Sequence, residues 1–272
     1  MGSNADMGHW WRWFRTRVNP CVIGLAMTGA LIVQAQERDR VPQPAKAEQL
    51  FAMANETRAR AGRGRLEWDS ALAEAAMKHC MRMAAEGPIS HRYGGEPDLT
   101  ERAGSAGAHF SLIEENIAVG SYPGKIHQAW LDSPAHRENL LNPEIDRVGI
   151  AVVAAKGVLF AVADYARAVP VLVPTQVEST VATQLRAKGV AVRRDAADAR
   201  AACHLDHGLP SLTGTDSPQF VMRWQGPDVD RLPSDLVERL ASGRYRQAAV
   251  GSCPARNAEG SFTVYRVAVL LY

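Results

Sequence analysis

A polar stretch in the middle of the chain, SPAHRENLLNP at residues 133–143, decides how the first half of the sequence folds. Ser133 can cap a short helix, Pro134 suits its first position, and Asn142-Pro143 ends it. His136 therefore lies in the first turn of this helix. Because the positive end of the helix macrodipole disfavours imidazolium there, we expect a neutral imidazole that can act as a ligand.

Two further polar positions lie upstream of this helix, at His91 and Glu115. His91 opens an irregular stretch, residues 90–107, whose glycine, proline and charged residues are typical of a loop that lines a site. Taken alone, two histidines far apart in sequence with one carboxylate between them are a weak metal signal, because zinc motifs are credible mainly at close spacing. A hydrogen-bonded network that braces the loops is the alternative.

The first residues have the composition of a secretory signal peptide. Three arginines precede an apolar run from Cys21 to Val33, and Val33-Gln34-Ala35 has the small residues of a cleavage site. The run is shorter than the roughly 20 residues that a membrane-spanning helix needs. We therefore expect residues 1–35 to be removed as a signal peptide, leaving a secreted or periplasmic protein with no stable membrane span.

The charge balance argues against nucleic acid as a partner. Residues 1–35 hold three of the 31 basic and one of the 29 acidic side chains, so a chain that begins at Gln36 has no net charge. Such a chain lacks the basic footprint of proteins that bind nucleic acid or anionic membranes. A hydrophobic content of 46% over 272 residues is enough for two modest domains with real cores.

The first half of the chain has the periodicity of a mixed domain. After a proline-bearing linker around residues 41–44, the pattern predicts helices over 50–61 and 69–86, then strands over 148–154 and 158–165. Asp69 can cap the second helix, and Cys80 inside it is interpreted as a buried structural thiol. The strands close the first domain near Arg167.

The pattern restarts after Pro170 and Pro174, and residues 175–272 are predicted to form a small α+β domain. Its last strand, residues 262–271, is so apolar that we expect it to be central. Cys203 and Cys253 lie in this region, and in an oxidising compartment they can pair as a disulfide that stabilises a small domain.

Several motifs now occur in a recognisable order: NETR at 55–58, LEWD at 66–69, SH at 90–91, ENIA at 115–118, Trp130, the 133–143 stretch and VGI at 148–150. Together they resemble the CAP superfamily (SCP domain), which comprises cysteine-rich secretory proteins, antigen 5 and pathogenesis-related 1 proteins, and in particular its bacterial branch. The resemblance covers about residues 45–167. It implies an α-β-α sandwich, so that the chain as a whole is α+β, with a CAP domain followed by the domain at 175–272.

The resemblance also implies a shallow cavity lined by two histidines and two acidic residues, which in some family members binds a divalent metal. His91 and His136 match the histidines, and Glu115 matches one acid. The fourth position falls near Ser133, which is no carboxylate. Either Asp132 or Glu114 substitutes for it, although Glu114 is otherwise expected to face solvent, or the site is incomplete. Neutral imidazoles with one carboxylate suit zinc.

These residues favour a binding module over an enzyme. The cavity would hold a divalent metal or, as the family's lipid and sterol binders imply, an apolar, sterol-like or other cell-envelope ligand. The alternative is a metal-assisted hydrolase of peptide or envelope polymer, in which Glu115 and His136 are catalytic and Glu115 acts as general base. No Gly-x-Ser-x-Gly or His-Glu-x-x-His motif supports that alternative.

Overall fold

The N-terminal sheet is built from strands that lie far apart in the sequence. The computed structural model describes residues 40–212, 216–256 and 261–272, so the predicted signal peptide lies outside the described residues. The strand order is β1-β4-β5-β3, with β2 pairing parallel to β4. The strands are β1 (Val41–Pro42), β2 (Glu67–Trp68), β3 (Phe110–Gly120), β4 (Arg147–Ala155) and β5 (Val158–Ala168). β3 therefore lies at the edge of this sheet, next to β5.

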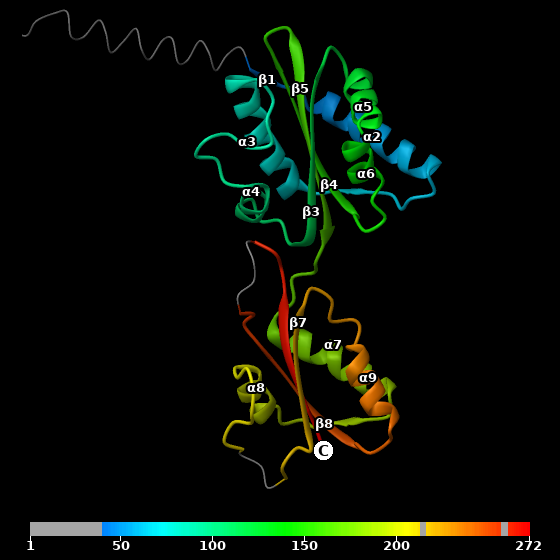
Figure 1. The fold of residues 1–272 in the computed structure, drawn as a ribbon, viewed down its shortest axis with the longest axis vertical. Coiled ribbons are helices and arrows are strands. Elements are labelled where there is room, and N and C mark those ends of the chain that lie inside the picture. Colours follow the sequence, from blue (N-terminus) through cyan, green and yellow to red (C-terminus); the bar gives the residue numbers. More distant parts are fainter. Residues whose placement is uncertain (1–39, 213–215, 257–260) are drawn as a thin grey trace, which may run out of the picture. The chain divides into compact units, whose positions relative to one another are not determined.

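Helices cover both faces of this sheet, as Figure 1 shows. α3 and α4 lie on one side, and α2, α5 and α6 lie on the other. The predicted α-β-α sandwich is confirmed. The helices are α2 (Pro44–Arg60), α3 (Ser70–Glu86), α4 (Leu99–Ser105), α5 (Pro123–Asp132) and α6 (Pro134–Leu141).

Apolar side chains fill both layers of the sandwich. Leu50, Ile126, Trp130 and Leu140 from the helices on one face pack against β4 and β5 in one core cluster. Cys80 packs in the cluster on the other face and is fully buried, as predicted for a structural thiol.

The backbone of α3 lies directly against β4 at one glycine. A Cβ atom on Gly149 would lie 2.0 Å from the backbone nitrogen of Ala73. Asp69 begins α3 as predicted, because its side chain accepts hydrogen bonds from the backbone N–H groups of Ala71 and Leu72. These two contacts fix where α3 starts and how closely it packs.

Three local expectations need correction. The linker expected around residues 41–44 instead forms β1, which pairs with β4, and the first residue of α2. Residues 90–107 were expected to be irregular, but Asp98 and Glu101 form a capping box that begins α4. Ser133 is the N-cap residue of α6, but its side chain makes no capping hydrogen bond.

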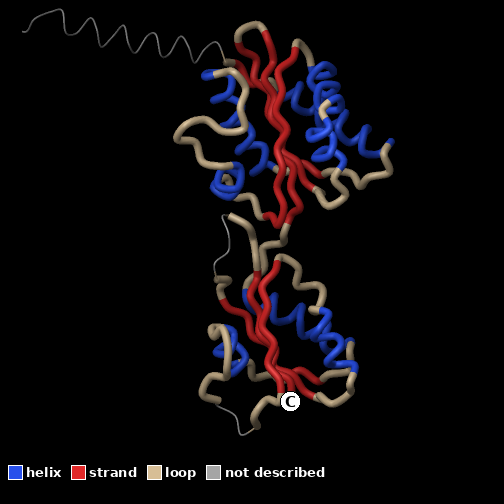
Figure 2. The backbone as a smooth tube through the Cα atoms, viewed as in Figure 1, coloured by secondary structure: helices blue, strands red, loops and turns tan. Residues whose placement is uncertain are grey.

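The C-terminal sheet has the order β6-β8-β9-β7, so the last strand is central, as its apolar sequence predicted. In Figure 2, helices lie on both sides of this sheet. The Cys203–Cys253 disulfide, which joins α8 to β8, is confirmed, with Cα atoms 5.9 Å apart. The elements are α7 (Pro174–Ala187), β6 (Ala191–Val192), α8 (Ala197–Cys203), β7 (Phe220–Gly226), α9 (Ser234–Ala241), β8 (Gln247–Cys253) and β9 (Tyr265–Leu271).

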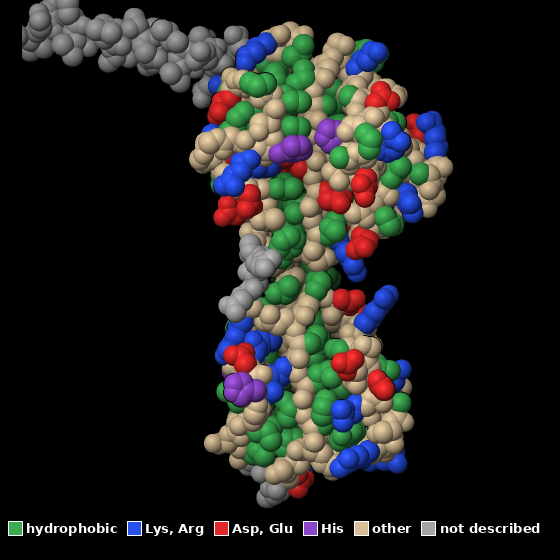
Figure 3. All heavy atoms as spheres, viewed as in Figure 1, with side chains coloured by type: hydrophobic (Ala, Val, Ile, Leu, Met, Phe, Trp, Pro, Cys, Tyr) green, Lys and Arg blue, Asp and Glu red, His purple; other side chains and the backbone are tan. Residues whose placement is uncertain are grey.

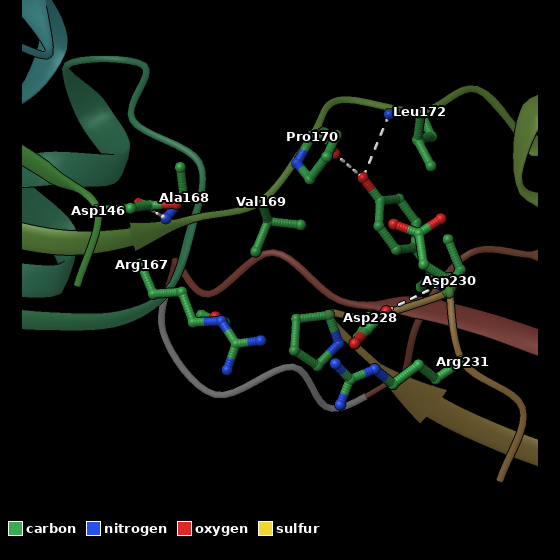
Figure 4. Close-up of a pocket in the computed structure, with 13 residues that line it drawn as sticks. Asp146, Arg167, Ala168, Val169, Pro170, Leu172, Asp228, Asp230 and Arg231 are labelled. Carbon is green, nitrogen blue, oxygen red and sulfur yellow. Dashed lines mark hydrogen bonds between the residues drawn. The ribbon is translucent and has the colours of Figure 1, made fainter. Parts of the chain in front are cut away.

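The segment between the two sheets is tied to β9. The backbone N–H of Leu172 donates to the hydroxyl oxygen of Tyr265 at 3.2 Å, and that hydroxyl donates to the carbonyl of Pro170 (Figure 4). None of the helices within the described residues is long and apolar enough to cross a membrane. The predicted domain boundaries, 45–167 and 175–272, stay a prediction.

Candidate functional site

Glu115 on β3 is held from two sides. Its Oε1 atom accepts a hydrogen bond from Nδ1 of His91 at 2.8 Å, and its Oε2 atom accepts one from Nη2 of Arg102 at 2.5 Å. The Glu115 residue is only 6% exposed. Both oxygens of the carboxylate therefore have charge-assisted or ring N–H partners inside the protein.

The contact with Glu115 sets the tautomer of His91. A carboxylate can only accept, so Nδ1 of His91 must donate to it. In the neutral ring the other nitrogen, Nε2, is then the one with a free lone pair. The His91 side chain is 57% exposed, so this nitrogen is free to meet a ligand from solvent.

His136 lies beside His91. The two ring centroids are 6.3 Å apart and the ring planes are inclined by 46°. Burial, and then the neighbouring His91, lower the pKa of His136 below its ordinary value. The neutral imidazole expected from its place in α6 is thus favoured by its surroundings as well. Figure 3 shows histidine side chains at the surface of the N-terminal domain.

Amide side chains fix α6 against β3. Nδ2 of Asn116 donates to the backbone carbonyl of His136 at 2.8 Å. Nδ2 of Asn139 lies within hydrogen-bond distance of the Glu115 carbonyl (3.2 Å) and of Oδ1 of Asn116 (3.0 Å). Hydrogen bonds therefore join the helix that carries His136 to the strand that carries Glu115, close to both residues.

A buried arginine holds the other end of α6. The Arg58 side chain donates to the carbonyls of Leu140, Asn142 and Ile145 at 2.8, 2.9 and 3.2 Å, and to that of Gly64 at 2.7 Å. Arg102 likewise donates to the carbonyls of His91 and Pro97. Both arginines brace loops around the site.

Sequence reasoning missed a buried layer beneath Glu115. His79 on α3 is fully buried, with Nδ1 at 2.8 Å from Oε1 of Glu96, Nε2 at 3.0 Å from the carbonyl of Ser90, and the same nitrogen 3.9 Å from Oε2 of Glu115. Burial raises the pKa of Glu96, but hydrogen bonds from His79 and from the backbone of Tyr93 outweigh it, so the net shift is downward. The lowered pKa favours the carboxylate form of Glu96, and both ring nitrogens of His79 face oxygen atoms of the protein.

Asp164 on β5 is a second residue that sequence reasoning missed. It is fully buried and lies opposite Glu115 in the β3–β5 pairing. Burial, and then the charge of Glu115, raise the pKa of Asp164 well above its ordinary value. Neither of its oxygens has a hydrogen-bond partner among the described residues. The raised pKa therefore favours the protonated form of Asp164 beside Glu115.

The two candidates for the fourth position lie elsewhere. Asp132 is exposed, and its Oδ1 accepts from Nε2 of Gln128 at 2.8 Å. Glu114 is half-buried rather than solvent-facing, and its Oε1 accepts from Nδ2 of Asn142 at 2.9 Å. Burial raises the pKa of Glu114, and the charges of Glu138 and Glu144 raise it further. In the part of the chain that the structure describes, no group of three or more histidine, cysteine or acidic side chains is placed to hold a metal.

The donor set that does converge is the pair His91 and His136. Two imidazoles on one tetrahedral zinc would have ring centroids about 5 Å apart, compared with the 6.3 Å found here. His91 and His136 are therefore the two candidate ligands that lie side by side, and Glu115 contacts His91 through Nδ1.

Comparison with known proteins concerns the N-terminal domain. Residues 51–165 match the family model of CAP, the cysteine-rich secretory protein family. An uncharacterized membrane protein, YlbC, of Bacillus subtilis (strain 168) is 30% identical over 122 residues, which are 43% of this chain and 34% of that protein. An uncharacterized protein of Borreliella burgdorferi is 28% identical over 100 residues, or 37% of this chain and 64% of that protein. The chain thus matches between about a third and two thirds of the length of these relatives.

Similar solved structures cover nearly half of the chain. An outer surface protein from Borrelia burgdorferi is 22% identical, with a TM-score of 0.45, and the match covers 47% of this chain and 97% of that one. An extracellular protein containing a SCP domain from Bacillus anthracis is 28% identical, with a TM-score of 0.43, over 46% of this chain and 41% of that one. The sandwich and the motif order agree with the family match, so the resemblance to the CAP superfamily is confirmed over residues 51–165.

Proposed function

We propose that this protein is a secreted or periplasmic binding module whose CAP domain uses His91 and His136 to hold one divalent metal ion, with zinc the best fit. The observation that carries the proposal is the hydrogen bonding of Glu115, whose two carboxylate oxygens accept from His91 and Arg102. A histidine whose Nδ1 donates to a carboxylate is the arrangement that supports metal ligands in proteins, because it fixes the ring and raises its basicity.

The proposed site is an open one. Zinc usually has four ligands, and here the protein supplies two neutral imidazoles. The remaining positions would be taken by water or by a donor atom of a cell-envelope ligand. We therefore expect weaker binding than at structural zinc sites with four protein ligands. The lipid or sterol-like ligand that the resemblance implies stays a prediction.

The same contacts argue for binding rather than hydrolysis. A general base must be able to take a proton from water within hydrogen-bond reach. Glu115 is buried, and its oxygens are occupied by His91 and by the permanently charged Arg102.

Metal content and calorimetry test the proposal. We expect wild-type protein to bind zinc with a stoichiometry near one, and the double variant His91→Ala plus His136→Ala to lose this binding. His207→Ala is the matched control, because this histidine is exposed and lies in the C-terminal region. Glu115→Gln should weaken zinc binding by about 10- to 100-fold while both histidines remain. Zinc binding that survives in the folded double variant would refute the proposal.

A further inference from the structure

A separate cavity of about 590 Å³ opens beside α6. Its charged lining residues are Arg63, Glu114 and Glu138, and Asn139, Leu141 and Asn142 also line it. Successive side chains of a strand point to opposite faces, so Glu114 faces away from the side on which Glu115 contacts Arg102 and His91. The contact of Glu114 with Asn142, just after α6, agrees with this. The cavity is thus distinct from the histidine pair.

Glu114 brings an incompletely satisfied carboxylate to this cavity. Its Oε1 atom accepts from Asn142, whereas its Oε2 atom is buried without a hydrogen-bond partner among the described residues. A buried carboxylate oxygen with no donor is costly, and such groups call for a bound partner. A positively charged donor at this oxygen would offset the burial of the carboxylate and satisfy it best.

Two more charges of this cavity lack partners. Neither Glu138 nor Arg63 forms an ion pair within the described ranges, and both side chains are exposed. The cavity thus presents two carboxylates and one guanidinium that no other part of the described chain neutralises. Its volume lies within the range of about 300–1,000 Å³ that is usual for small-molecule sites.

We propose that this cavity binds a small zwitterion, an amino acid or a short peptide with free ends, through its ammonium group at Glu114 and Glu138 and its carboxylate at Arg63. An ammonium group supplies the donors that the carboxylates need. The guanidinium fork matches a carboxylate, and Leu141 offers apolar surface to a side chain.

Titration of the full chain with L-alanyl-L-alanine, followed by NMR and calorimetry, tests the proposal. We expect saturable binding at concentrations up to about 10 mM, the scale of a weak single-site ligand, with shifts at Glu138 and Leu141. N-acetylated dipeptide lacks the ammonium and dipeptide amide lacks the carboxylate, so each should bind at least tenfold more weakly. Glu114→Gln and Arg63→Gln should cause a similar loss, whereas the exposed Glu48→Gln should not.

The controls separate this site from the proposed metal site. The double variant His91→Ala plus His136→Ala should bind the dipeptide as the wild type does, whether or not the wild type binds zinc. Arg63 is exposed, so Arg63→Gln should fold normally even if Glu114→Gln does not. The proposal is overturned if no resonances shift, if the blocked dipeptides bind as well as the free one, or if magnesium or calcium chloride moves these resonances and the dipeptide does not.

Discussion

Replacement of Arg58 by methionine should show how strongly α6 depends on one buried side chain. Arg58 is fully buried and donates to four backbone carbonyls, of which those of Leu140 and Ile145 are themselves buried. Methionine keeps much of the apolar stem but none of the donors. Each buried carbonyl left without a partner costs about 1–3 kcal/mol, so the two together should lower the free energy of unfolding by roughly 2–6 kcal/mol.

The lower part of this range is the better expectation. Burial lowers the pKa of Arg58, which means that the folded protein holds this charge at a cost that methionine removes. Water is also expected to reach the carbonyls of Gly64 and Asn142, which are only partly buried. We therefore expect a loss of about 2–4 kcal/mol.

Urea unfolding of Arg58→Met, compared with Arg60→Met, measures the effect. Arg60 lies on the same helix, is exposed and pairs only with Glu56 one turn away, so its replacement should cost less than about 0.5 kcal/mol. A difference below about 1 kcal/mol between the two variants would refute the reasoning, because the carbonyls would then be satisfied without Arg58.

Other predictions concern packing, pH and the disulfide. Gly149→Ala should destabilise the protein by about 1–3 kcal/mol or more, since its Cβ would meet the backbone of α3, while Gly64→Ala, with open space around it, should be nearly neutral in thermal unfolding. Asp164→Asn should stabilise the protein at pH 7–8 but not near pH 4. The pKa of Asp164 is raised in the folded state, so the folded protein keeps this proton at a pH where the unfolded chain has lost it. The free energy of unfolding of the wild type therefore falls as the pH rises above the unfolded-state pKa, and asparagine removes this loss. Unfolding curves across pH check this, and an unchanged or larger gain at low pH would contradict it. The variant Cys203→Ala plus Cys253→Ala, which opens a link across 50 residues, should lose about 4 kcal/mol in the C-terminal region, and a loss below about 1 kcal/mol in denaturant titration would contradict the loop-entropy estimate.

The sequence predicts the surface of the candidate site better than its interior. His91, Glu115 and His136 belong to short contiguous motifs, so their positions can be assigned before any contact is known. His79 and Glu96 meet only because α3 packs on the sheet and the loop after it folds back. A histidine on the apolar stripe of a helix is a usable signal, but its partner in a loop has no fixed spacing.

Asp164 and α4 were missed for different reasons. Asp164 interrupts the apolar run of β5. A prediction from the alternation of apolar and polar residues treats an acid there as the end of the strand, and it cannot recognise an acid that is buried inside the strand. The start of α4 carried the signature of a capping box in Asp98 and Glu101, but the helix is only seven residues long and its surroundings are rich in glycine. Short elements leave too few residues for periodicity to be decisive.

The alternation of β3 explains how one short segment can serve two sites. Glu114 and Glu115 are neighbours in sequence, yet one lines the cavity beside α6 and the other holds His91. α6 repeats the arrangement, since His136 faces His91 while Glu138 lines the cavity. Asn139 joins the two elements through the Glu115 carbonyl and Asn116. Because the side chains diverge while the backbone is shared, a change of charge at Glu114 can leave the histidine pair intact, whereas a shift of α6 must alter both sites.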